Sequence, residues 1–243
     1  MNLHVPLTRV LAFATPLIVT AFAGAQDTPA AGGGEEESVI AEIFKWDNAG
    51  PIGYLILLMS IIALALIIEN FMNIKREKLA PPDLIDELEA LFDEENFQEA
   101  AELCEQETNY LTKCVGAGLS KLGHAFETIQ ITIREMETEE SVKLFQKIGW
   151  LSLMSAIAPM MGLFGTVSGM FVTFGKIASA GGSVSPSVLA GGIKMALITT
   201  MLGLSVAIPV GVCFFILRGR VVRISTEVNA MAEELFERFR KNK

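Results

Sequence analysis

The segment Ser155-Ala-Ile-Ala-Pro-Met-Met-Gly-Leu-Phe-Gly-Thr-Val-Ser-Gly169 decides the fold, because it places small residues and a hydroxyl at helical spacing within a membrane-length apolar run. One helical face there carries Gly162, Thr166, Gly169 and Thr173. A face without bulky side chains lets another backbone approach closely, which is how helices associate in lipid. The run from Ile193 to Leu217 repeats this spacing with Ala196, Thr200, Gly203 and Ala207. Two helices are therefore predicted to present small, hydroxyl-bearing faces for packing.

The composition of the 243 residues is typical of an integral membrane protein, with 51% hydrophobic residues and a mean hydropathy of +0.45. The net charge of -9 is concentrated in residues 73–147, where acidic side chains outnumber basic ones. This excludes a basic surface for nucleic acid. The three cysteines have no metal-site spacing and are expected to be reduced thiols, so neither a metal nor a cofactor is expected.

The N-terminal region has the pattern of a secretory signal peptide over residues 1–25. Arg9 precedes an apolar core, and Ala23-Gly-Ala25 resembles a cleavage site. The alternative is an uncleaved additional membrane helix. Residues 26–49 are expected to be a periplasmic linker followed by a short interfacial helix from Val39 to Trp46.

The remaining pattern predicts an all-α membrane protein with three transmembrane helices and long cytoplasmic helical extensions. The expected parts are transmembrane helix 1 at 50–72, a cytoplasmic helical region at 73–147, transmembrane helix 2 at 148–177, a short periplasmic turn at 178–192, transmembrane helix 3 at 193–217 and a cytoplasmic C-terminal helix at 218–243. Basic residues cluster after the first span, before the second and after the third. The positive-inside rule therefore predicts a periplasmic N-terminus and a cytoplasmic C-terminus in the bacterial inner membrane.

The cytoplasmic region is predicted to be helical throughout. Asp83 is the expected N-cap of its first amphipathic helix, and the pattern continues through Asn96 to Cys104. Thr128 to Gln146 has no stop signal before the membrane, so helix 2 is expected to project from the bilayer as one continuous helix.

No catalytic constellation occurs along the chain, and an enzyme is not expected. Between Ser152 and Leu217 there is no Asp, Glu or His. Because intramembrane proton relays generally use such groups, a protonatable carboxylate must come from another chain. The two spans instead supply hydroxyls, of which Thr166 and Thr200 lie within small-residue faces. Bonding of each threonine to its own helix is the simpler interpretation.

Two motifs resemble the MotA/TolQ/ExbB proton channel family, and within it the ExbB/TolQ branch. They are Ala158-Pro-Met-Met-Gly-Leu-Phe-Gly-Thr-Val-Ser-Gly-Met170 and Ala196-Leu-Ile-Thr-Thr-Met-Leu-Gly-Leu-Ser-Val-Ala-Ile-Pro209. The resemblance implies that Thr166 and Thr200 face the ion pathway. It implies packing or kink positions at Pro159, Gly162, Gly165, Gly169, Gly203 and Pro209. Many relatives carry Glu where this chain has Met195, beside Lys194, and Trp where it has Ser168.

The resemblance also implies the partners and the function. The expected assembly is a homopentamer around an ExbD/TolR-like single-span protein, whose Asp carries the ion, with a TonB/TolA-like periplasm-spanning protein as a further partner. It would convert proton or sodium motive force into mechanical work on the envelope, for transport or envelope maintenance. The alternative is a structural membrane scaffold without ion conduction of its own.

Overall fold

The structure is a computed structural model that describes residues 50–180 and 185–241, all of them within the unit Ala49–Lys243. The predicted signal peptide, linker and interfacial helix lie outside these residues. Within the described part, the regular structure is entirely α-helical. This confirms the predicted fold class.

Among the described residues, three helices are long and apolar enough to cross a membrane: α3 (Gly50–Asn73), α8 (Phe126–Ser179) and α9 (Pro186–Lys241). At a rise of about 1.5 Å per residue, α8 is roughly 80 Å long, whereas the hydrocarbon core of a bilayer is about 30 Å thick. Only part of α8 can lie in lipid. The helix is continuous from Phe126, so the predicted extension of the second span is confirmed.

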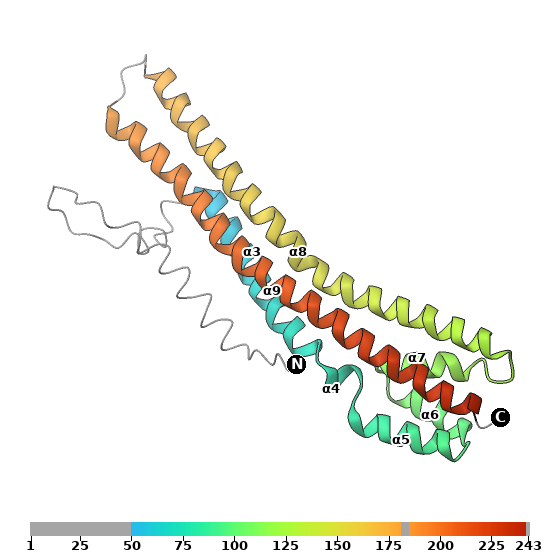
Figure 1. Cartoon of the computed structure of the whole chain (residues 1–243). Coiled ribbons are helices and arrows are strands. Elements are labelled where there is room, and N and C mark those ends of the chain that lie inside the picture. Colours follow the sequence, from blue (N-terminus) through green and yellow to red (C-terminus); the bar gives the residue numbers. More distant parts are fainter. Residues whose placement is uncertain (1–49, 181–184, 242–243) are drawn as a thin grey trace. The chain divides into compact units, whose positions relative to one another are not determined.

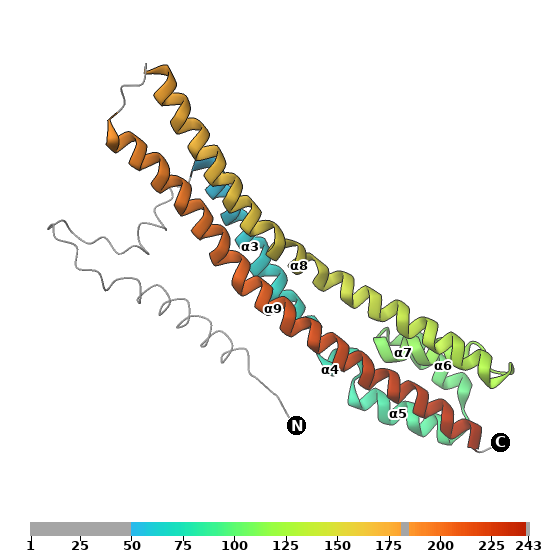
Figure 2. The same ribbon diagram turned by 45° about the horizontal axis from the view of Figure 1, so that its top comes forward.

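The two longest helices, α8 and α9, form an antiparallel hairpin and lie side by side along most of their length (Figures 1 and 2). Helix α9 begins at Pro186, earlier than the span start expected at Ile193, so residues 186–192 are helical and the expected turn is too long. Proline suits the first position of a helix, where its missing N–H has no intrahelical acceptor.

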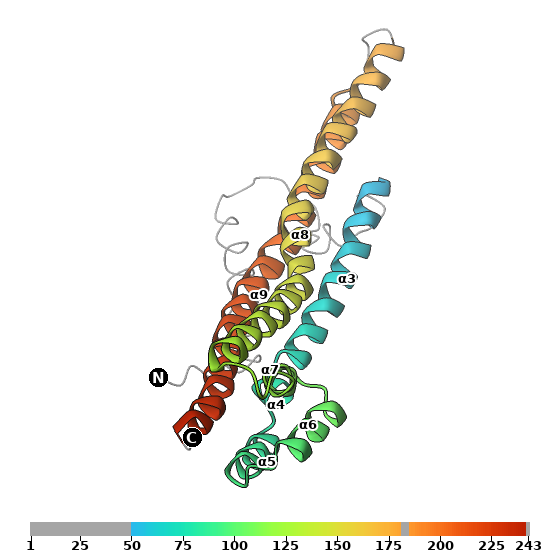
Figure 3. The ribbon, with the colours of Figure 1, turned by 90° about the vertical axis from the view of Figure 1, so that its right-hand side faces the viewer.

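Four shorter helices follow α3: α4 (Arg76–Leu79), α5 (Pro82–Asp93), α6 (Phe97–Gln106) and α7 (Tyr110–Leu119). They gather beside the end of the hairpin that contains the start of α8 and the end of α9 (Figure 3). We refer to α4–α7 with the adjoining parts of α8 and α9 as the polar bundle.

The start of α5 differs from the prediction. Pro81 is the N-cap residue and Pro82 is the first helical residue, so Asp83 lies inside the first turn and was wrongly predicted as the cap. A proline at the first helical position sets the backbone without needing a side-chain cap.

The continuous pattern expected through Asn96 is also interrupted. Glu95 has a left-handed φ of 54°, its N–H donates to Phe92 O, and the Asn96 N–H donates to Leu91 O. These are the two bonds of a Schellman ending, which terminates α5. The Asn96 side chain then accepts a hydrogen bond from the Glu99 N–H and caps α6.

The polar bundle has an apolar core in which aromatic rings join its helices. Phe92 of α5 lies edge-to-face with Phe97 of α6 and Phe236 of α9, at centroid distances of 5.6 and 5.3 Å. Leu111 and Val115 of α7 are fully buried in the same cluster. These contacts fix α7 against α8 and α9.

Candidate functional site

The apolar part of the α8–α9 hairpin is packed through glycines. A Cβ on Gly162 would lie 3.0 Å from the Thr199 carbonyl oxygen, and a Cβ on Gly203 would lie 2.6 Å from the Ala158 carbonyl oxygen. A Cβ on Gly165 would meet the Thr199 hydroxyl at 2.5 Å. The small-residue faces therefore pack against each other within one chain, which is a use that the sequence pattern did not distinguish from packing between chains.

Gly169 belongs to the same face but lies in a less crowded place. A Cβ on Gly169 would lie 3.5 Å from Ala196 Cβ, an ordinary van der Waals distance. The four glycines of the predicted packing set thus differ in the room around them.

Thr200 reaches across the hairpin rather than along its own helix. Its hydroxyl donates to the Gly162 carbonyl oxygen at 3.3 Å. The neighbouring Thr199 lies 3.4 Å from the same oxygen and donates at 2.8 Å to Ala196 O in its own helix. Thr199 is the more buried of the two, with 3% exposure. It was not predicted as a site residue, although its place between Ala196 and Gly203 was visible in the sequence.

Thr166 and Thr173 bond to their own helix, as the simpler interpretation of a membrane threonine expects. The Thr166 hydroxyl donates to Leu163 O at 2.7 Å, and the Thr173 hydroxyl donates to Gly169 O at 2.8 Å. Thr166 is half-buried, whereas Thr173 is buried. The two predicted pathway residues, Thr166 and Thr200, are thus partly exposed, and the hydroxyl of each already has a backbone acceptor.

The two predicted prolines lie inside the long helices, Pro159 in α8 and Pro209 in α9. Each removes one backbone hydrogen bond from its helix. The carbonyl that faces Pro159 belongs to Ser155, whose hydroxyl donates across the hairpin to Ala207 O at 3.2 Å. The hairpin is therefore held by hydroxyl-to-carbonyl bonds near both Gly162 and Pro159.

A cavity of about 430 Å³ is lined by residues from the start of α3 and from the α8–α9 hairpin. Its lining includes small residues, hydroxyls and one lysine, among them Gly165, Ser168, Thr173, Lys176, Met195 and Thr199. Ser168 and Met195 are therefore neighbours of one cavity, a relation that sequence separation concealed. In the part of the chain that the structure describes, the residues lining this cavity offer hydroxyls and one lysine but no carboxylate.

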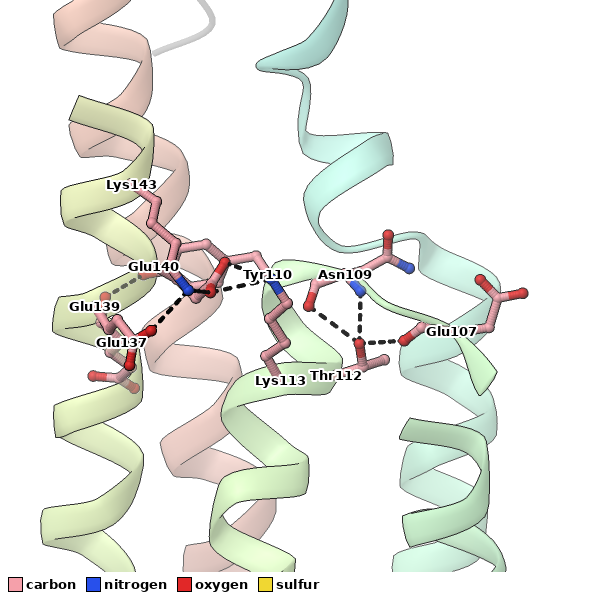
Figure 4. Close-up of polar contacts among 9 residues, drawn as sticks. All are labelled: Glu107, Asn109, Tyr110, Thr112, Lys113, Glu137, Glu139, Glu140 and Lys143. Carbon is pink, nitrogen blue, oxygen red and sulfur yellow. Dashed lines mark hydrogen bonds and ion pairs between the residues drawn. The ribbon is translucent and has the colours of Figure 1, made fainter. Parts of the chain in front are cut away.

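A second polar site, which the sequence interpretation missed, lies in the polar bundle (Figure 4). The Lys113 ammonium is 3.1 Å from both carboxylate oxygens of Glu140, and the Lys143 ammonium is 2.7 Å from one of them. Burial alone would raise the pKa of Glu140, but the hydrogen bonds from Lys143 and Lys113 outweigh it and lower the pKa. Glu140 is therefore a buried, ionised and fully paired carboxylate.

Tyr110 joins the three helices around this site. Its hydroxyl lies 3.1 Å from the Glu137 carbonyl oxygen, 2.8 Å from the Ser141 hydroxyl and 2.9 Å from Asn229 Oδ1. Burial raises the pKa of Tyr110 to about 12, so the phenol keeps its proton at neutral pH.

The start of α7 positions these side chains. The Thr112 hydroxyl accepts from the Asn109 N–H at 2.8 Å, which completes a capping box at the first turn of α7 (Figure 4). Tyr110 and Lys113 occupy that turn and the next, so the cap fixes their direction toward α8.

The sequence periodicity of α8 could have indicated that Glu137 and Glu140 are buried. The buried face of α8 in the polar bundle has a spacing of four, four, three and four residues, and it consists of Ile129, Ile133, Glu137, Glu140 and Leu144. Two glutamates thus occupy the apolar stripe of an amphipathic helix. Carboxylates at such positions are rare unless they are paired or functional.

Neither metal nor thiol chemistry is indicated in the described residues. No group of three potential metal ligands occurs among them. Burial raises the pKa of Cys104 to about 11 and, with the nearby Glu137 and Glu140 carboxylates, that of Cys114 to about 12. All three cysteines are free thiols.

The helices that carry both sites are those that match known proteins. The model of the MotA/TolQ/ExbB proton channel family matches residues 105–230, which include α7, α8 and most of α9. The chain belongs to this family, and its curated relatives place it with the ExbB proteins.

Three relatives illustrate the similarity. A biopolymer transport protein ExbB homolog of Methanothermobacter thermautotrophicus is 28% identical over 75% of this chain and 64% of that protein. The biopolymer transport protein exbB1 of Vibrio cholerae is 44% identical over 24% of this chain and 26% of its own length. The biopolymer transport protein ExbB of Xanthomonas campestris is 42% identical over 34% of this chain and 32% of its own length. The chain thus covers less than two thirds of each of these relatives.

Proposed function

We propose that this chain is an ExbB/TolQ-like subunit of an ion-driven motor in the bacterial inner membrane. It would convert proton or sodium motive force into mechanical work on the envelope, for transport or envelope maintenance. A homopentamer would enclose the membrane helices of an ExbD/TolR-like single-span partner, with a TonB/TolA-like protein carrying force across the periplasm. The polar bundle and the end of α9 would be cytoplasmic, and the chain's N-terminus periplasmic.

This proposal is supported chiefly by the lack of an ionisable proton-transfer group in the α8–α9 hairpin, which belongs to the part of the chain that matches the family. From Ser152 to Leu217 the sequence contains hydroxyls but no Asp, Glu or His. An ion-transferring group in a membrane is usually a carboxylate or histidine. A partner helix that brings a carboxylate to Thr166 and Thr200 would supply the missing group, and a partly accessible threonine hydroxyl can donate to it in its ionised form.

The cavity lined by Thr199 supports an ion route that does not need a carboxylate in this chain. Ser168, Thr173 and Thr199 contribute hydroxyls to its lining. Water in a polar cavity needs two to four such partners.

A scaffold function is the second candidate, and one specific observation favours it. The hydroxyls of Thr166 and Thr200 both donate to backbone carbonyls of the same chain, at Leu163 and Gly162. Threonines bonded in this way need have no role beyond helix packing. The hairpin would then serve only to assemble a membrane complex.

Reconstitution separates the two functions. The chain would be purified from its native host, and any co-purifying single-span protein with an intramembrane Asp identified. The complex and the chain alone would be placed in vesicles with an imposed ion gradient. We expect flux through the complex and little through the chain alone. A stable complex that conducts neither protons nor sodium would support the scaffold.

A further inference from the structure

Glu137 stands out because it is buried without a partner for its charge. Its side chain is on the face of α8 that packs into the polar bundle, and the residue is 7% exposed. Among the described residues, Glu137 Oε1 is the only buried side-chain oxygen or nitrogen atom without a hydrogen-bond partner. An ionised carboxylate in that position carries a large desolvation cost, whereas a neutral one does not.

The nearby hydrogen-bonding groups are already engaged elsewhere. The Tyr110 hydroxyl contacts the backbone oxygen of Glu137, the Ser141 hydroxyl and Asn229 Oδ1. A phenol has a single proton to donate, so these contacts use its capacity. The Tyr110 hydroxyl therefore contacts the Glu137 backbone and leaves the Glu137 side-chain Oε1 without a hydrogen bond. Figure 4 shows Tyr110 and Glu137 in this region.

The surrounding charges also leave Glu137 uncompensated. The titratable groups around it are Tyr110, Lys113 and Cys114 from α7, Arg134, Glu139, Glu140 and Lys143 from α8, and Glu233 from α9. Both lysines are bound to Glu140, and Lys143 also binds Glu139 at 2.8 Å. The Arg134 guanidinium is 3.1 Å from a Glu233 carboxylate oxygen. Each nearby cation thus has another carboxylate.

We infer that Glu137 is a proton-binding site of the polar bundle, and that loss of its proton weakens the packing of α7 on α8 and α9. Glu140 and Glu137 then behave differently although they share one helix face. Glu140 keeps its negative charge through two lysines, whereas Glu137 binds and releases a proton.

The direction of the pH effect follows from the two states of Glu137. Burial, reinforced by the Glu233 carboxylate and opposed by Arg134, raises the pKa of Glu137 to about 7 from its ordinary value of 4.5. A folded state with the higher pKa binds the proton more tightly than an opened state does. The stabilisation is complete below about pH 4.5, falls as the pH rises, and is lost once the pH has passed about 7.

Hydrogen exchange of α7 tests this inference without an ion gradient or a partner. The purified full chain in lipid nanodiscs would be measured by mass spectrometry at pH 6 and pH 8, with each rate corrected for intrinsic exchange. From the two pKa values, protection of α7 amides should fall about tenfold between these pH values. Glu137→Gln mimics the protonated form and should keep α7 protected at both.

Glu135→Gln is the matched control, because Glu135 is exposed and lies two residues earlier on the same helix. It should retain the tenfold change. Equal protection of wild-type α7 at pH 6 and pH 8, or an undiminished pH effect in Glu137→Gln, would overturn the inference. If Glu137→Gln does not fold, pH-difference infrared spectroscopy of the wild type decides. A protonated carboxylic acid that titrates near pH 7 supports the site, and its absence contradicts it.

Discussion

At the scale of single residues, the room around each glycine decides how the hairpin tolerates substitution. Gly203→Ala would push a methyl group to 2.6 Å from the Ala158 carbonyl oxygen, so α8 and α9 must move apart. Gly169→Ala would place its methyl group 3.5 Å from Ala196 Cβ, which is ordinary contact. We expect Gly203→Ala to destabilise the hairpin by about 1–3 kcal/mol and Gly169→Ala to have little effect.

Thermal unfolding of the purified proteins in one detergent, followed by circular dichroism, measures this difference. Gly203→Ala should unfold at a clearly lower temperature than the wild type, while Gly169→Ala stays close to it. Equal unfolding temperatures for both variants would contradict the close approach of α8 and α9 at Gly203.

The glycine positions were predicted from the sequence, whereas the buried glutamates of the polar bundle were missed. Gly162 and Gly203 follow a helical spacing that needs no knowledge of the partner helix. Whether they pack within or between chains depends on the hairpin geometry, which spacing does not contain. Glu137 and Glu140 share the apolar stripe of α8, which spacing can show, but their contacts with α7 and α9 depend on tertiary packing, which spacing does not contain.

At the scale of helices, the distribution of basic residues sets the predicted orientation. Lys121 lies in the turn region before α8 and is exposed. In a background without native cysteines, Lys121→Cys should resist an impermeant thiol reagent in intact cells and react after permeabilisation. Ser183→Cys, placed between α8 and α9, should react in intact cells. Labelling of the first position with protection of the second would invert the topology.

Helix continuity could be predicted, but one helix ending could not. The extension of α8 to Phe126 follows from an amphipathic pattern without a stop signal. The end of α5 at Asp93 has no glycine after it to mark it, because Glu95 adopts the left-handed conformation there. The contacts of Phe92 with Phe97 and Phe236 favour this sharp change in direction.

At the scale of the whole molecule, oligomerisation now rests on different surfaces from those suggested by the sequence. The glycine faces pack inside the hairpin, but large apolar side chains point outward from both helices, including Phe171 at 80% and Phe215 at 74% exposure. Lipid or neighbouring subunits can cover them. With the family membership, this leads us to expect a homopentamer.

Native mass spectrometry of the complex released from nanodiscs measures the stoichiometry directly. We expect five copies of this chain, with or without the single-span partner. A monomer that persists across all protein concentrations would contradict the closed assembly and leave the outward apolar faces to lipid alone.

The central claim is that the Thr166 and Thr200 hydroxyls belong to an ion pathway. Threonine to valine keeps the side-chain shape and removes the hydroxyl, so Thr166→Val and Thr200→Val should assemble normally while losing a contact for an ionised partner carboxylate. Thr226→Val is the matched control, because Thr226 is exposed, its hydroxyl bonds to Val222 O in its own helix, and it lies outside the proposed ion route.

The decisive measurement is ion flux through vesicles containing the complex, with partner retention measured in the same samples. Flux should fall at least tenfold in Thr166→Val and Thr200→Val, which corresponds to about 1.4 kcal/mol in the barrier, and should change much less in Thr226→Val. Full flux in both pathway variants, with the partner bound, would contradict the claim and leave these threonines a packing role.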